Sequence, residues 1–105
     1  MSKVIACTDE TLKTESSEGL VLIDFMADWC NPCQQLMPIL DEVAQEHDGQ
    51  AKIVKVNVDQ SPASTKEYGV RGIPALFIVK NGEIVQRLVG LQTKDALTKA
   101  LNSHA

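Results

Sequence analysis

The sequence predicts a single α/β domain over residues 1–105, and three observations lead to that prediction. Short apolar runs alternate along the chain with segments whose apolar residues recur at helical spacing, as in chains whose strands are joined by helices. Asn81-Gly82 stands between two apolar runs, which is the pattern of a two-residue hairpin turn. No repeat or linker divides the 105 residues. We therefore expect a mixed five-stranded sheet with helices on both faces.

The first three expected elements are a short strand, a helix and a longer strand. Residues 4–7 form a short apolar run, and Thr8 is a suitable N-cap for a helix over 9–17, in which Leu12 is the only large apolar residue. In residues 20–27 apolar side chains occupy both sets of alternating positions, which is typical of a strand covered on both faces. We therefore expect 20–27 to be a central strand.

A long helix is expected next. Within residues 32–47 apolar residues recur at helical spacing, and Asp48-Gly49 supplies a stop signal. Pro38 lies inside this segment, where its ring removes a backbone donor and clashes with the preceding turn. We predict a kink near residues 34–38.

A third strand and a short helix follow. Residues 52–58 alternate apolar and polar side chains over most of their length, as a strand does. Ser61 as the cap and Pro62 as the first helical residue predict a helix that ends near Tyr68.

The last third of the chain reads as a hairpin and a helix. Residues 75–80 and 83–89 flank Asn81-Gly82, and Thr93 is placed to cap a C-terminal helix with an apolar stripe. Helices separate the first three strands, so these should be parallel, whereas the hairpin makes the last two antiparallel. The expected order is strand, helix, strand, helix, strand, helix, strand, strand, helix.

Composition and charge exclude several functional classes. With 44% apolar and 23% charged residues the chain should form a packed core. Ten Lys and Arg against 14 Asp and Glu give a net charge of −4, which argues against nucleic acid or an anionic membrane as the main partner. The longest apolar run, residues 75–79, is too short to cross a bilayer.

The cysteine count and the N-terminal residues indicate in which cellular compartment the protein is expected. Three cysteines are too few for a disulfide scaffold, and residues 4–6 are too short an apolar run for the core of a signal peptide. We expect a cytoplasmic, monomeric protein.

Trp29-Cys30-Asn31-Pro32-Cys33 lies where the central strand should end and the long helix begin, the usual place for chemistry in open α/β sheets. Cys30 would lie at the helix cap, where free N–H groups and the helix dipole favour a thiolate, so it is the expected nucleophile. Cys33, one turn further on, would resolve the mixed disulfide. The motif therefore predicts a redox-active pair.

A zinc site is the alternative for this motif. Tetrahedral zinc needs four ligands, and beyond the pair only Cys7, His47 and His104 remain, without a second pair at suitable spacing. We expect no metal.

Asp24 interrupts the apolar run of the central strand. A carboxyl buried there loses hydration, so its pKa should rise. The alternative is that Asp24 faces solvent at a sheet edge.

The chain resembles the thioredoxin family along essentially its whole length, and the expected architecture is the thioredoxin fold. The matching segments, in family order, are Val21-Leu22-Ile23-Asp24-Phe25, Ala27-Asp28-Trp29-Cys30, Pro32-Cys33, Pro38, Lys55-Val56-Asn57-Val58-Asp59, Tyr68-Gly69-Val70-Arg71-Gly72-Ile73-Pro74, Lys80-Asn81-Gly82 and Val89-Gly90. The resemblance implies a general protein-disulfide reductase with no bound cofactor. It also implies disulfide-containing clients and re-reduction by a thioredoxin reductase, with electrons from NADPH.

The resemblance also implies roles for residues outside the pair. Asp24 would be a buried proton acceptor beneath Cys33, and Lys55 on the neighbouring strand would tune it, unless Lys55 is simply a solvated strand residue. Pro74 would form a cis bond facing the dithiol. Clients would dock on a surface around the nucleophile that consists of Trp29, Val58, Gly72, Ile73, Val89, Gly90 and Leu91, although Val58, Val89 and Leu91 could instead belong to the core.

Four residues depart from the family pattern. Asn31 stands where most members have glycine, and we expect it to cap the helix with Gln34 completing a capping box, in competition for the N–H groups that stabilise the Cys30 thiolate. Met26 replaces a tryptophan, and Gln34 replaces a frequent basic residue. Cys7 replaces an apolar residue and is expected to be a buried small hydrophobe, with a regulatory or dimerising thiol as the alternative.

Two other functions remain open on the sequence. One is an oxidant or isomerase with the same fold, which a much less negative reduction potential would reveal. The other is a redox-indifferent binding subunit, whose function would survive replacement of both Cys30 and Cys33 by serine.

Overall fold

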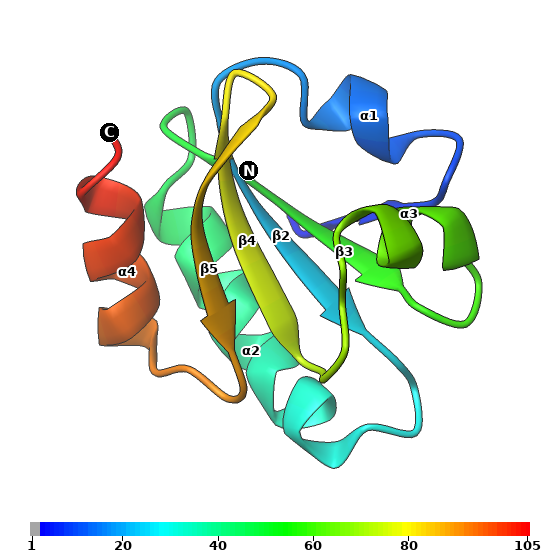
Figure 1. The fold of residues 1–105 in the computed structure, drawn as a ribbon. Helices are drawn as coiled ribbons and strands as arrows, with labels where there is room; N and C mark the ends of the chain where they lie inside the picture. Colours follow the sequence, from blue (N-terminus) through cyan, green and yellow to red (C-terminus); the bar gives the residue numbers. More distant parts are fainter. Residues whose placement is uncertain (1–2) are drawn as a thin grey trace.

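The computed structural model describes residues 3–105, and these form one five-stranded sheet with helices on both faces (Figure 1). The elements in chain order are β1 (Ile5–Cys7), α1 (Leu12–Glu15), β2 (Leu20–Met26), α2 (Asn31–Glu46), β3 (Lys52–Asn57), α3 (Pro62–Glu67), β4 (Ala75–Lys80), β5 (Glu83–Val89) and α4 (Lys94–Asn102). The element order predicted from the sequence is confirmed. Residues 1 and 2 of the expected domain lie outside the described residues.

The strands lie in the order β1-β3-β2-β4-β5, so β2 is central as expected. β3 is parallel to both β1 and β2, while β4 is antiparallel to β2 and to β5. The expected parallel and antiparallel pairs are therefore confirmed. Because β2 and β3 run in the same direction, their carboxyl ends meet at the same edge of the sheet.

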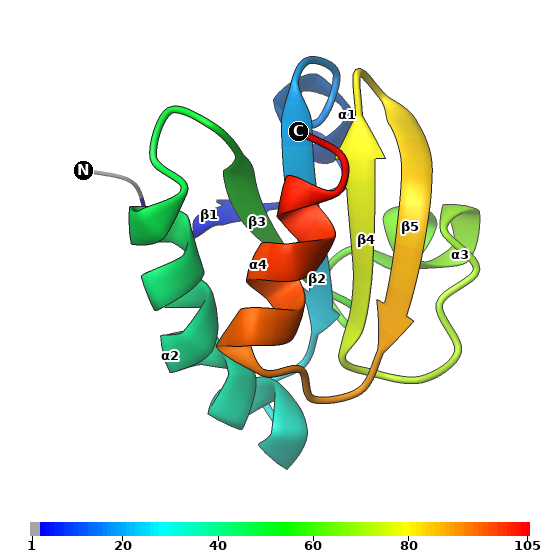
Figure 2. The ribbon, with the colours of Figure 1, turned by 90° about the vertical axis from the view of Figure 1, so that its left-hand side faces the viewer.

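Each face of the sheet is covered by two helices. Figure 2 shows α2 and α4 in front of the sheet, with α1 and α3 behind it. Leu22 of β2 packs with Leu36 of α2 and Leu97 of α4, whereas Ile23 and Phe25 belong to the core cluster on the opposite side. Burial on both faces explains why β2 carries apolar residues at nearly every position.

The long helix and the hairpin follow their local signals. Gly49 adopts a φ of 81° just after α2, where the stop was expected. Asn81 and Gly82 adopt φ values of 50° and 84°, and both hairpin strands have the predicted bounds. α2 continues through Pro38, and the kink expected near it stays a prediction. Among the helices formed by residues 3–105, none combines the length and apolar character needed to span a bilayer.

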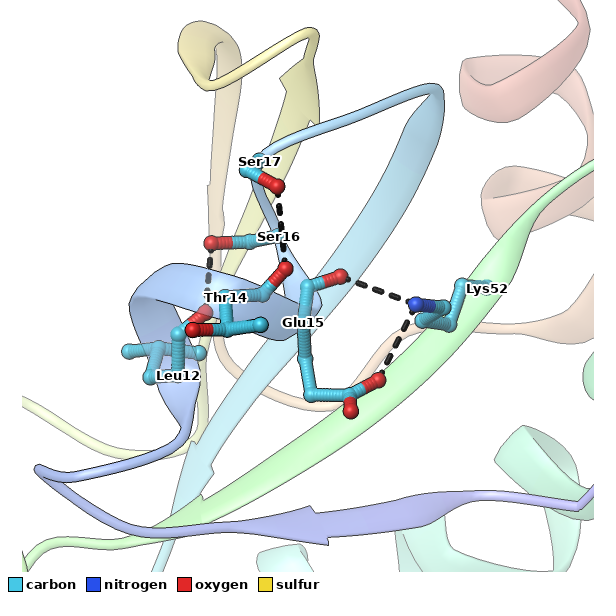
Figure 3. Close-up of polar contacts among 6 residues, drawn as sticks. All are labelled: Leu12, Thr14, Glu15, Ser16, Ser17 and Lys52. Atoms are coloured by element: carbon cyan, nitrogen blue, oxygen red, sulfur yellow. Dashed lines mark hydrogen bonds and ion pairs between the residues drawn. The ribbon is translucent and has the colours of Figure 1, made fainter.

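The first helix is much shorter than predicted. α1 is a single turn whose N-cap position is Thr11 rather than Thr8, and the expected start at Asp9 was wrong. Side chains bond to the carbonyls of this turn: the hydroxyl of Ser16 donates to the Leu12 carbonyl at 2.7 Å, and Lys52 of β3 donates to the carbonyl of Glu15 (Figure 3). Lys52 also forms an ion pair with the Glu15 carboxylate, at 3.0 Å.

Asp9 instead stabilises another helix. Its carboxylate accepts hydrogen bonds from the backbone N–H groups of Ala63 and Ser64 in the first turn of α3, at 3.2 and 2.8 Å. Ser61 occupies the N-cap position and Pro62 is the first helical residue, as predicted, but the Ser61 hydroxyl makes no capping bond. The cap of α3 therefore comes from a residue that lies more than fifty positions away.

Candidate active site

The cysteine pair lies between the end of β2 and the start of α2, at the edge of the sheet where β3 also ends. Cys30 and Cys33 form a disulfide, with their Cα atoms 5.2 Å apart. Cys30 is the N-cap residue of α2, and its sulfur accepts a hydrogen bond from the backbone N–H of Cys33 at 3.3 Å. The expected place of Cys30 at the cap is confirmed. Such a donor at a helix N-terminus favours negative charge on sulfur.

Asn31 does not cap the helix. It is the first residue of α2, so Pro32 is the second rather than the first. The Asn31 side chain is exposed and makes no hydrogen bond within residues 3–105, because the sulfur of Cys30 already occupies the capping position. The expected capping box with Gln34 is therefore wrong: the Gln34 amide donates to the carbonyls of Ala27 and Asp28 instead.

The two sulfurs differ in exposure. Cys33 is inaccessible to solvent, whereas Cys30 keeps a 6% exposed fraction. Both pack with Met26 and Ala27, and half-buried Val58 and Ile73 cover this cluster. An incoming group therefore reaches Cys30 more readily than Cys33.

Asp24 is buried in the centre of the sheet. It pairs with Lys55 of β3 on one side and Leu76 of β4 on the other, and it is inaccessible to solvent. The alternative of a solvent-facing edge residue was wrong, because β2 has a neighbour on each side. By strand alternation its side chain points to the same face as Leu22, which is the face that α2 covers.

The environment of this carboxyl perturbs its acidity. Burial raises the pKa of Asp24 from 3.8 to about 7, and the positive charge of Lys55 partly opposes that rise. Neither carboxyl oxygen has a hydrogen-bond partner among the described residues. Lys55 itself is half-buried, so it is neither a fully solvated strand residue nor a core residue. A carboxyl with a pKa near neutrality can both take up and release a proton at working pH.

Trp29 is held in a defined orientation although 70% of its surface is exposed. Its indole N–H donates to the Asp59 carboxylate at 2.8 Å. The sequence pattern alone assigns no role to Asp59. Its position just after β3 is a usable signal, because polar residues that follow neighbouring parallel strands meet at one edge of a sheet.

The residues expected on the docking surface fall into a connected set. The Ile73–Pro74 bond is cis, and the Ile73 carbonyl lies 3.8 Å from the sulfur of Cys30. Pro74 in turn accepts a hydrogen bond from the Gly90 backbone N–H at 2.8 Å, which places Val89 and Gly90 beside it. Gly72 is exposed on the preceding loop.

Two of the apolar residues on this surface are clearly not core residues. Val89 is 70% and Leu91 47% exposed, so the alternative that they are buried was wrong. Val89 is the last residue of β5, an edge strand with no neighbour on its outer side, and Leu91 lies in the loop between β5 and α4. Val58 is half-buried and packs against the cysteine cluster. Exposed apolar side chains that adjoin one another mark a surface for partners.

Cys7 lies apart from this site, at the end of β1. It is buried in the core cluster of Val21, Ile23 and Phe25, as expected of a small hydrophobe. Burial raises the pKa of its thiol, while the Thr11 hydroxyl opposes that rise. No cluster of three or more His, Cys, Asp or Glu residues that could hold a metal ion occurs in the described part of the chain.

Comparison with known proteins gives consistent matches over the whole length. The family model described as Thioredoxin matches residues 3–103. Thioredoxin of Bacillus subtilis (strain 168) is 43% identical over 101 residues, covering 96% of this chain and 97% of that one. Thioredoxin 1 of Synechococcus elongatus is 44% identical over 106 residues, covering 99% of each. The solved structure of a mutant thioredoxin from Halobacterium salinarum NRC-1 superposes with a TM-score of 0.89 at 40% identity, covering 96% of this chain and 89% of that one.

Proposed function

The chain belongs to the thioredoxin family, and from that membership we propose how its own residues divide the work of disulfide reduction. The protein is a thiol-disulfide oxidoreductase that reduces protein disulfides and carries a redox-active disulfide of its own. The observation that carries the proposal is the disulfide between Cys30 at the cap of α2 and solvent-inaccessible Cys33. This asymmetry assigns a different step to each sulfur.

The first step belongs to Cys30. Its thiolate attacks one sulfur of a client disulfide, a Cys30–client bond forms, the client S–S bond breaks, and the leaving thiolate takes a proton from solvent. The Cys33 N–H, 3.3 Å from the Cys30 sulfur, supports the attacking thiolate. Asn31 and Pro32 form the turn that joins the two sulfurs.

The second step belongs to Cys33. Its thiol passes a proton to the Asp24 carboxylate, and the resulting thiolate attacks the sulfur of Cys30. The Cys30–client bond breaks and the second client sulfur leaves as a thiolate, which takes a proton from solvent. Two electrons and two protons have then passed to the client, the Cys30–Cys33 disulfide is restored, and Asp24 later releases its proton. Because Cys33 is shielded from solvent, an internal acceptor is needed, and the Asp24 pKa of about 7 suits it. Lys55 limits how far that pKa rises.

The client binds at the exposed edge beside the nucleophile. An extended client segment lies along Gly72, Ile73 and Pro74 and contacts Trp29, Val89 and Gly90. Two features support this: the Ile73 carbonyl is 3.8 Å from the Cys30 sulfur, and the side chains of Trp29 and Val89 are 70% exposed.

The cellular setting follows the family. We propose that residues 1–105 act as a single, monomeric domain in the cytoplasm. A thioredoxin reductase re-reduces the disulfide with electrons from NADPH, and no cofactor or metal is bound. Disulfide-containing proteins are the clients, and nucleic acids and membranes are not partners.

A trapping experiment tests the division of roles. In a Cys7→Ala background, the Cys33→Ser variant should accumulate a mixed disulfide with a protein client, bonded through Cys30, because no resolving thiol is present. The Cys30→Ser variant should accumulate none. Mass spectrometry of the trapped species identifies the bonded cysteine, and trapping through Cys33 would overturn the assignment.

A coupled assay tests the cellular role. With a thioredoxin reductase and NADPH, the wild-type protein should reduce the disulfides of insulin catalytically. Failure with several reductases, while dithiothreitol still drives the reaction, would contradict the proposed electron source but not the chemistry of the pair.

A further inference from the structure

The segment that carries Trp29 and Cys30 lies between two regular elements. β2 ends at Met26 and α2 begins at Asn31, so residues 27–30 belong to neither. Outside a helix or a strand, the backbone N–H and C=O groups of such a segment need other hydrogen-bond partners. One hydrogen bond is within the turn, from the Cys30 N–H to the Ala27 carbonyl at 3.2 Å, and another is the bond from the Trp29 indole to Asp59.

Gln34 attaches to the segment as well: its backbone N–H donates to the Cys30 carbonyl at 3.1 Å, and its side chain adds further bonds. Its side-chain amide nitrogen donates to the carbonyls of Ala27 and Asp28, each at 3.4 Å. An amide nitrogen has two N–H groups, so it can serve two carbonyls at once. Gln34 is one residue beyond Cys33 in the first turns of α2. The contact therefore ties the start of the segment to the helix that follows it. Both cysteines lie in the sequence between Asp28 and Gln34, the residues that this contact joins.

The chemistry of the side chain suits this contact. Glutamate has no donor and would place its charge against two carbonyl oxygens, while methionine has a similar length but no N–H. Lysine has donors but adds a positive charge. Gln35, the next residue, is also exposed and makes no hydrogen bond to the 27–30 segment within the described residues.

We propose that Gln34 is a positioning residue for the reduction of protein disulfides: by holding the carbonyls of Ala27 and Asp28, it keeps Trp29 and the nucleophile Cys30 aligned with the client-docking edge at Ile73 and Pro74. The proposal rests on the proposed roles of Cys30 and the docking surface. The Gln34 side chain makes no hydrogen bond to either sulfur, yet it determines the rate with protein clients. Small disulfides, which need no docking along that edge, do not depend on it.

The test compares Gln34→Met with Gln34→Lys and with the matched control Gln35→Met. Reduced protein is mixed with insulin or with oxidised glutathione at a pH where alkylation kinetics show Cys30 fully ionised, so that changes in its pKa do not enter. Gln34→Met should lower the second-order rate constant for insulin reduction by about threefold to tenfold, the factor expected for one or two exposed hydrogen bonds. Its rate with glutathione disulfide should stay within about twofold of wild type, and Gln35→Met should behave as wild type with both.

Two further readouts separate positioning from general structural damage. Trp29 is the only tryptophan, so its fluorescence anisotropy reports directly on the segment and should fall in Gln34→Met at a temperature where circular dichroism shows full folding. Gln34→Lys restores N–H donors and should recover most of the insulin rate.

Defined results would overturn the proposal. These are an unchanged insulin rate in Gln34→Met, equal losses with insulin and glutathione disulfide, or an equal loss in Gln35→Met. If wild type itself fails to reduce insulin, the proposed function fails instead, and Trp29 anisotropy together with the glutathione rate still decides whether Gln34 holds the segment.

Discussion

The buried carboxyl of Asp24 makes the stability of the protein depend on pH in a direction that can be calculated. The pKa of Asp24 is about 7 in the folded protein and 3.8 is its ordinary value. Each unit of difference corresponds to about 1.4 kcal/mol, so ionising this carboxyl in the folded state costs about 4 kcal/mol. Burial is the main cause, and Lys55 reduces the effect.

Whether the free energy of unfolding rises or falls with pH depends on which state, folded or unfolded, binds more protons. Well below its ordinary pKa of 3.8, Asp24 is protonated in both states and the cost is absent. As the pH rises, the unfolded chain loses this proton first, while the folded protein keeps it until the pH passes about 7. The folded state therefore binds more protons over this interval, and the free energy of unfolding falls as the pH rises. Between about pH 5 and pH 8.5 this one group should lower it by about 3 kcal/mol.

The variant Asp24→Asn removes the titration while keeping the shape of the side chain. Its free energy of unfolding should lack this pH dependence, so the difference between variant and wild type should change by about 3 kcal/mol from about pH 5 to pH 8.5, in favour of the variant. Urea denaturation of the oxidised protein, followed by far-UV circular dichroism, measures both. The disulfide removes the titration of Cys30 and Cys33 from the comparison.

A matched control is available in Asp28, which is exposed and lies outside the sheet. Asp28→Asn should keep the pH dependence of wild type. If the free energies of unfolding of wild type and Asp24→Asn differ by the same amount at every pH, then Asp24 does not ionise in this range. It could not then act as the proton acceptor.

Three further predictions concern other residues of the chain. Lys55→Met removes a positive charge beside Asp24, so the pH interval over which stability declines should move upward in the same denaturation series, and a downward move would contradict the pairing. Thr93→Ala removes the bond to the Ala96 N–H at the start of α4 and should lower the free energy of unfolding by about 1 kcal/mol, whereas Thr93→Ser should retain most of it. Cys7→Ala should leave insulin reduction unchanged, and native Cys7 should react with a bulky maleimide only after unfolding; rapid labelling of the folded protein would instead indicate a regulatory thiol.

Elements with strong local signals could be predicted closely. The hairpin strands have the predicted bounds because Asn81 and Gly82 both take up positive φ, which few other residue pairs allow. The cap of α4 was also predictable, since the Thr93 hydroxyl accepts from the N–H of Ala96, only three residues further on. The place of the cysteine pair at a strand-to-helix junction also follows from neighbouring residues alone.

Two predictions about helix starts were wrong because more than one group could form the capping bond, and the local sequence does not show which group forms it. Thr8 and Asp9 have the residue types of a helix start, but Asp9 bonds to α3 and leaves α1 as one turn. Asn31 and Pro32 read as a cap and a first residue, but the sulfur of Cys30 occupies the capping position one residue earlier.

The sequence by itself determined which elements form, the central place of β2 and the identity of the reactive pair, because propensities, caps and turns act over a few residues. Only the tertiary structure decided that Asp59 orients Trp29, that Asp9 caps α3 and that Val89 is exposed. Each of these depends on which strand ends meet and which strand lies at the sheet edge. Those arrangements come from packing the two faces of the sheet, and no single segment of the chain contains them.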